Sequence, residues 1–118
     1  MDGGNVPVKM TTMGQLTKQK VHNFVEYCRA NLDLPEEACI QLAQLEGMGE
    51  VALIAALKSE LYPYRNAVGE RNAEALPPQF RSLAVQCLHS ATEEQCNMVW
   101  RYLELFCDIV DRMHAHHD

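Results

Sequence analysis

The feature that most constrains the fold of this chain is an apolar repeat near its C-terminus. Between residues 96 and 113, apolar side chains recur at alternating intervals of three and four residues. This spacing keeps them on one side of an α-helix, which completes a turn about every 3.6 residues. Thr92 and Gln95 precede the repeat with the T-x-x-Q spacing of an N-terminal capping box. The sequence therefore predicts a long final helix with a packed seam made of Cys96, Val99, Leu103, Phe106, Val110 and Met113.

A second apolar row lies beside this seam, so the final helix carries more apolar surface than one neighbouring helix would cover. The row consists of Met98, Tyr102, Leu105 and Ile109, and Trp100 flanks the seam. Two interpretations are open. Either two neighbouring helices bury both rows, or the excess apolar surface marks a partner-binding site. Under the second interpretation, the partner contacts are Trp100, Tyr102, Leu105 and Ile109.

A second group of candidate contact residues lies in the sequence Tyr62-Pro63-Tyr64-Arg65. Tyrosine and arginine are enriched among the residues that dominate binding energies at protein interfaces. A tyrosine that closes a helix end is also common packing. Tyr62 and Tyr64 are therefore secondary candidates for partner binding.

The rest of the chain also shows helical periodicity, interrupted by proline and glycine. The patterns predict helices from about residue 13 or 17 to 31, from 35 to 47, from 50 to 61 and from 77 to 89. Residues 63–77 are ambiguous, with a short helix over 72–76 as one option. The apolar run 51–57 predicts that the helix over 50–61 is the most buried element. The expected fold is an all-α antiparallel bundle of five helices, or six, with a long C-terminal helix.

The chain length suits a single domain, because domains cluster near 100–150 residues and this chain has 118. Residues 1–12 contain two glycines and one proline and lack periodicity. We therefore expect residues 1–12 to form a flexible N-terminal arm and residues 13–118 to form one helical domain.

The sequence ends in a group of histidine and aspartate residues that suggests a metal site. Imidazole and carboxylate groups suit Zn²⁺, and a continuing helix would bring some of them onto one face. Terminal residues usually fray, however, so a solvated tail is the competing interpretation. The candidate metal ligands are Asp111, His114, His117 and Asp118.

Other chemical signatures are weak, and the sequence assigns no residue a catalytic role. Gly47-Met48-Gly49 follows a predicted helix rather than a strand, so it does not indicate a phosphate-binding loop. The chain has five cysteines, an odd number, without a C-x-x-C pair. Each falls in an apolar helical pattern, which favours reduced core residues over a disulfide framework or a nucleophile.

Charge and hydropathy exclude two classes of partner. The net charge is −6, whereas direct nucleic-acid binding usually requires a basic surface. The longest apolar run is far shorter than the roughly 20 residues of a membrane-spanning helix, so we expect no membrane partner. The first twenty residues also lack the apolar core of a secretion signal, which predicts an intracellular protein, cytoplasmic or nuclear.

These observations lead to two functional hypotheses. The first is a non-enzymatic protein–protein interaction module, an adaptor or regulatory domain that binds another protein or itself as a homodimer. The alternative is a helical protein that binds a small ligand or a metal such as zinc, with or without enzymatic activity, through the C-terminal histidine and aspartate cluster. The first needs no cofactor.

Overall fold

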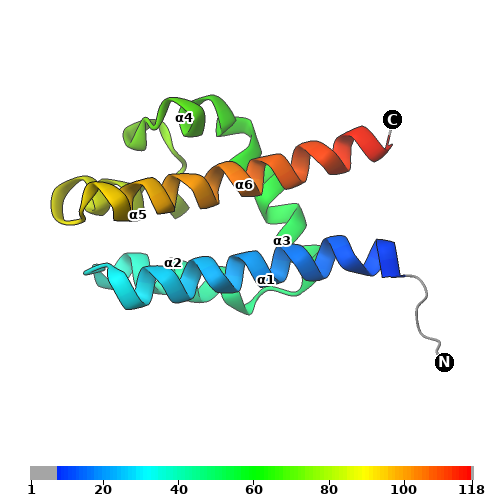
Figure 1. Ribbon diagram of the computed structural model, residues 1–118, viewed down its shortest axis with the longest axis horizontal. Helices are drawn as coiled ribbons and strands as arrows, with labels where there is room; N and C mark the ends of the chain where they lie inside the picture. The colour runs from blue at the N-terminus through cyan, green and yellow to red at the C-terminus, as the bar shows by residue number, and fades with distance from the viewer. Residues whose placement is uncertain (1–7, 118) are drawn as a thin grey trace.

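The computed structural model describes the backbone of residues 8–117 and the side chains of residues 13–78 and 80–113. Over that range the chain is helical and contains no strand, so the predicted all-α class is confirmed. The two longest elements are α1 (Val8–Asn31) and α6 (Glu93–His117). They cross the molecule side by side, with the chain running in opposite directions along them (Figure 1). The long C-terminal helix is confirmed, whereas an antiparallel order of the whole bundle stays a prediction.

Helix α1 begins at Val8, within the segment that the sequence analysis had given to a flexible arm. Extending an existing helix by one residue adds a hydrogen bond while ordering only that residue, so helices propagate readily beyond their packed part. The apolar stripe used to predict the helix marks where it packs against its neighbours. It does not mark where the helix begins. Residues 1–7 of the predicted arm lie outside the described residues.

Helix α2 (Glu36–Gly47) follows Pro35, as its sequence predicts. Its first turn holds two glutamates, whose negative charge is favourable at the positive end of the helix dipole. The helix buries only one stripe, made of Ala38, Leu42 and Leu45.

Helix α3 (Glu50–Ala56) is far more exposed than its apolar sequence suggests. Leu53 is fully buried, but the side chain of Val51 is 84% exposed. The prediction that this segment is the most buried element is wrong. The reason is that this short helix packs through one face only, the face of Leu53, whatever the composition of its other faces.

The chain continues from α3 through two irregular turns instead of one regular helix to Leu61. A π-helical turn covers Leu57–Leu61, and a 3₁₀ turn covers Tyr62–Tyr64. Pro63 lacks an N–H group, and its ring would clash with the carbonyl four residues earlier in a regular α-helix. The wider π turn relieves this conflict while Leu57 and Leu61 both stay buried.

Residues 65–76, which the sequence left ambiguous, form helix α4 (Arg65–Glu70) and a 3₁₀ turn at Ala73–Ala75. Gly69 lies inside α4 and does not end it. The helix ends at Glu70, and the next residue, Arg71, has a positive φ of 56°. The N–H groups of Arg71 and Asn72 donate to carbonyls of the last turn, the pattern of a left-handed helix end.

Helix α5 (Pro78–Ser90) leads into α6 through a turn that contains the predicted capping box. The N–H of Gln95 donates to Thr92 Oγ1 over 3.1 Å, and the N–H of Thr92 donates to Gln95 Oε1 over 3.0 Å. Two backbone N–H groups that an uncapped helix start would leave unpaired are thereby satisfied.

We expect Thr92→Ala to lower the free energy of unfolding by about 1 kcal/mol, because it removes the acceptor for the N–H of Gln95. Urea denaturation followed by circular dichroism measures this difference. Thr92→Ser retains a hydroxyl and serves as the matched control. Equal stabilities of Thr92→Ala and wild type would show that the cap contributes nothing.

The core draws on every helix, and aromatic rings fill it where α1 meets α6. The ring of Phe24 on α1 lies 5.4 Å from that of Tyr102 and 5.5 Å from that of Phe106, measured between centroids. The middle of the predicted seam is buried, since Val99, Leu103, Phe106 and Val110 are each at most 2% exposed. This part of the seam prediction is confirmed.

Candidate functional site

The structure places the predicted partner residues of α6 mainly in the interior. Trp100 is 2% exposed and Ile109 is 3% exposed, so neither offers a surface to a partner in this fold. Tyr102 is half-buried between α6 and α1, with its ring 6.5 Å from that of Tyr27. Leu105 is also half-buried. Of the second apolar row, the chain's own helices therefore bury Ile109 and leave Met98, Tyr102 and Leu105 half-buried.

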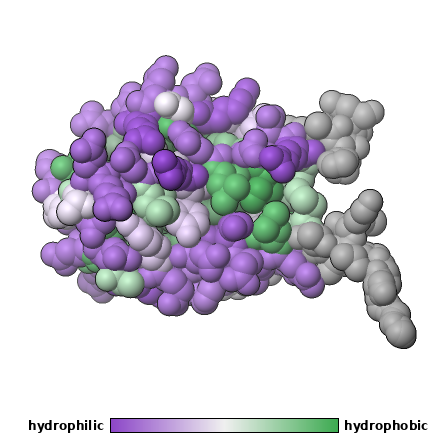
Figure 2. All heavy atoms as spheres, viewed as in Figure 1, coloured by the Kyte–Doolittle hydropathy of each residue, from purple (hydrophilic) through white to green (hydrophobic). Residues whose placement is uncertain are grey.

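An apolar surface remains where α1 and α6 continue past their aromatic contacts. Phe24 on α1 lies against Tyr102 and Phe106 on α6, which shows which residues of the two helices are opposite one another. Both helices advance by about 1.5 Å per residue. About two turns before Phe24, Leu16 therefore lies opposite the last part of α6, and its side chain is 38% exposed. Figure 2 shows apolar side chains gathered in this part of the molecule. We call the exposed and half-buried residues Met13, Leu16, Leu105 and Met113 the α1–α6 apolar surface.

Tyr62 joins residues that the sequence had assigned to two different sites. Its hydroxyl donates to the carboxylate of Asp111, a predicted metal ligand, over 2.8 Å. The guanidinium of Arg65 lies 4.4 Å from the centre of the Tyr62 ring, within the range of a cation–π contact. The hydrogen bond to Asp111 is the main cause that raises the pKa of Tyr62, because it stabilises the protonated phenol. Tyr64, by contrast, is 39% exposed.

The C-terminal metal prediction stays untested. Asp111 is exposed on α6, where its carboxylate accepts the hydrogen bond from Tyr62. The α6 backbone is helical at His114 and His117, but their side chains are not among those described, and Asp118 lies outside the described residues.

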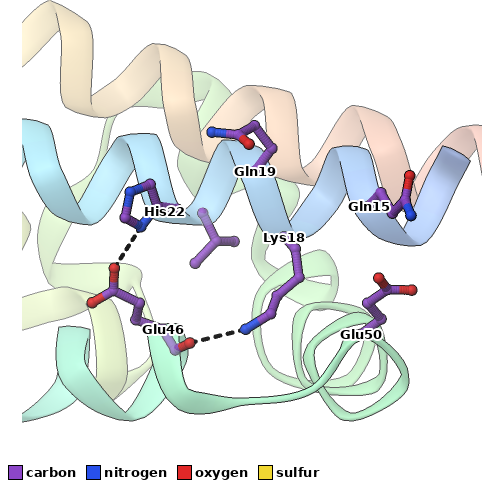
Figure 3. Close-up of a pocket in the computed structure, with 7 residues that line it drawn as sticks. Gln15, Lys18, Gln19, His22, Glu46 and Glu50 are labelled. Atoms are coloured by element: carbon purple, nitrogen blue, oxygen red, sulfur yellow. Dashed lines mark hydrogen bonds and ion pairs between the residues drawn. The ribbon is translucent and has the colours of Figure 1, made fainter.

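A polar cleft that the sequence analysis missed lies where α1 passes the end of α2 and the start of α3 (Figure 3). Its volume is about 570 Å³. His22 and Glu46 point toward one another across the cleft, with Nδ1 and Oε2 separated by 2.7 Å. Lys18 donates from Nζ to the backbone carbonyl of Glu46 over 3.1 Å. The cleft is lined by Gln15, Lys18, Gln19, Val21, His22, Glu46 and Glu50.

Glu46 is the centre of this polar network. Its second carboxylate oxygen, Oε1, accepts a hydrogen bond from Arg29 over 3.2 Å. Glu26, one helical turn after His22, contributes another carboxylate, and ligand atoms of His22, Glu26 and Glu46 all lie within 4.8 Å of one another. The i, i+4 spacing of His22 and Glu26 was visible in the sequence. The sequence did not indicate that Glu46 belongs to the same cluster, because only the packing of α2 against α1 brings Glu46 near His22 and Glu26.

The three buried cysteines provide no activated thiol. Cys28 and Cys87 are buried, and desolvation raises the pKa of each to about 12. Burial likewise raises the pKa of Cys107 to about 11. These thiols are protonated near neutral pH, whereas nucleophilic attack requires the thiolate. Cys39 departs from the expected core position and is exposed.

No protein-family model, curated protein or solved structure matches this chain. Within residues 8–117, every helix is too short or too polar to cross a membrane. Inferences about function therefore depend on the surfaces and clusters described above.

Proposed function

We propose that this chain is a non-enzymatic protein–protein interaction module that acts as an adaptor or regulatory domain. It binds its partner through the α1–α6 apolar surface. The observation that carries the proposal is Leu16, which is 38% exposed on the part of α1 that lies opposite the end of α6. Covering apolar area releases about 25 cal/mol per Å², so this surface favours association with a matching apolar face.

We expect the partner to present the apolar side of a helix. Rows of side chains on one helix pack into the grooves between such rows on another, through residues spaced three and four apart. The net charge of −6 disfavours nucleic acid as the partner. A second copy of this chain is the other protein partner that the sequence suggested, and the experiment below distinguishes the two.

The buried free thiols support a reducing, intracellular setting, cytoplasmic or nuclear.

We expect Leu16→Asp to abolish partner binding without unfolding the protein, because the side chain is already partly in water. Leu88→Asp is the matched control, since Leu88 is 62% exposed on a different helix, α5. Circular dichroism reports the fold. Light scattering reports the molar mass against the monomer value of 13.4 kDa. Affinity capture from lysate then compares the proteins retained by wild type, Leu16→Asp and Leu88→Asp.

The outcomes separate the kinds of partner. A wild-type dimer that Leu16→Asp converts to a monomer identifies the surface as a self-interface. A wild-type monomer that captures a protein lost with Leu16→Asp, but kept with Leu88→Asp, supports a different partner. Retention of every captured protein by a folded, monomeric Leu16→Asp variant would contradict the proposal.

The alternative function, binding of a metal or small ligand, is supported by the polar cleft between α1 and α2. The C-terminal cluster stays an untested candidate for the same function. Figure 3 places imidazole and carboxylate groups from different helices on a shared opening. This cleft is separate from the α1–α6 apolar surface, so the two functions do not depend on one another.

A further inference from the structure

Three side chains that commonly bind metal ions converge where α1 packs against α2. They are His22, Glu26 and Glu46, and their candidate ligand atoms all lie within 4.8 Å of one another. We propose that they form a binding site for Zn²⁺ or a similar divalent transition-metal ion. The ligands are Nδ1 of His22 and one carboxylate oxygen from each glutamate.

The three candidate ligands are on helices α1 and α2, so their backbone positions are well defined. His22 and Glu26 are four residues apart on α1 and therefore lie on the same face, one turn from each other. Glu46 is the second-last residue of α2 and approaches from the other helix. The C-terminal end of a helix carries partial negative charge, which favours a cation. The site thus combines two carboxylates with the negative end of a helix.

The distances require only small adjustments of flexible side chains. Zinc bonds to nitrogen and oxygen ligands are about 2.0–2.2 Å long, so ligand atoms around a tetrahedral ion lie roughly 3.4 Å apart. The pair His22 Nδ1 and Glu46 Oε2 is now closer, at 2.7 Å, and the widest spacing is within 4.8 Å. The side chain of His22 is 52% exposed and that of Glu46 is 27% exposed, so both have room to move and the ion has a path of entry.

The chemistry of the donor set favours a transition metal over calcium or magnesium. Imidazole suits zinc, copper and nickel, whereas calcium takes six to eight oxygen ligands and magnesium prefers near-octahedral oxygen sites. Three protein ligands leave a fourth position for water, as in an open zinc site. The 2.7 Å contact between His22 Nδ1 and Glu46 Oε2 is a hydrogen bond whose proton lies where the metal ion would bind. On metal binding that proton moves to Nε2 of the ring or is released to water.

Arg29 is the neighbouring cation that most directly competes with a metal ion. Its Nη1 contacts Oε1 of Glu46, whereas His22 contacts Oε2. The two oxygens therefore serve different partners, and the ion can bind Oε2 while Arg29 keeps Oε1. Lys18 contacts the backbone carbonyl of Glu46 and leaves its carboxylate available.

Zinc titration by calorimetry tests the proposal on the reduced full-length chain in a buffer that does not chelate metal. We expect saturable binding at this site that an excess of EDTA reverses. Removing a supporting residue outside the ligand set already costs roughly 10–100-fold in metal affinity, so we expect at least about 100-fold from His22→Ala. His89→Ala is the matched control, since His89 is exposed on α5, and its affinity should equal that of wild type.

Glu26→Gln distinguishes a metal site from a purely structural contact between α1 and α2. Glu26 takes no part in the hydrogen bonds that join His22 and Arg29 to Glu46. We therefore expect Glu26→Gln to weaken zinc binding while leaving the melting temperature of the metal-free protein unchanged. Unchanged zinc affinity in Glu26→Gln and His22→Ala would overturn the proposal.

Two rival zinc sites on this chain must give different results. The combined variant His114→Ala, His117→Ala tests the C-terminal cluster and should bind zinc with the affinity of wild type. Loss of zinc binding in this variant would overturn the proposal. Binding to cysteine would produce a thiolate charge-transfer band when Co²⁺ replaces zinc. A Co²⁺ complex without that band supports the nitrogen and oxygen ligands, and a strong band would overturn the assignment.

Discussion

Phe106→Ala is expected to lower the free energy of unfolding by about 3–5 kcal/mol, a large part of the stability of a domain this size. Phe106 is 0% exposed, and its ring lies 5.5 Å from Phe24 in an edge-to-face arrangement and 6.2 Å from Tyr102. Truncation loses the transfer free energy of the ring and leaves a cavity between α1 and α6. Such a cavity is costly because the surrounding helices relax only partly.

Urea denaturation followed by circular dichroism measures this loss. Leu88→Ala is the control, because Leu88 is 62% exposed and surface substitutions usually change stability by about 0.5 kcal/mol or less. Phe106→Leu should cost less than Phe106→Ala, since it fills more of the cavity. A Phe106→Ala variant as stable as the Leu88→Ala control would show that the contact between α1 and α6 is not the core of the fold.

Ile109→Asp is expected to unfold the protein at room temperature or to remove most of its stability. Ile109 is 3% exposed, so the substitution would bury a carboxylate among apolar side chains without a designed partner. The effective cost of burying an unpaired ion is several kcal/mol, comparable with the roughly 5–15 kcal/mol that stabilises a typical domain. The loss of packed methylene groups adds to that cost.

Circular dichroism and the cooperativity of urea unfolding test this expectation. Leu16→Asp introduces the same charge at a side chain that is 38% exposed, and it should remain folded. The contrast between the two variants separates core from surface within the region where α1 and α6 meet. A folded Ile109→Asp variant with wild-type stability would instead show that Ile109 faces outward, as a partner contact requires.

Together, the two proposed sites lie on different sides of α1. The apolar surface uses the side of α1 that faces α6, whereas the polar cleft uses the side that faces α2 and α3 (Figures 1 and 3). Substitutions at Leu16 and at Glu26 should therefore act independently. Failure of the zinc experiment would leave the interaction proposal intact, and the reverse is also true.

The local elements were largely predictable from the sequence. The seam of α6 and its capping box depend on residues within a few turns of one another, so spacing alone revealed them. The same was true of the start of α2, where Pro35 precedes two glutamates. The π turn and the 3₁₀ turn around Pro63 were not predicted. They combine the backbone restriction that Pro63 imposes with the burial of Leu57 and Leu61, and that burial depends on the rest of the fold.

The sequence by itself determined that this chain is helical, where its strongest helix lies and which side of that helix packs. Only the tertiary structure decided which apolar side chains stay exposed, since Ile109 is buried and Val51 is in water although both belong to apolar patterns in the sequence. It also brought Glu46 to His22 from 24 positions away in the chain. Helical periodicity reports neighbours within one helix, whereas burial and site geometry depend on contacts between helices that no local pattern encodes.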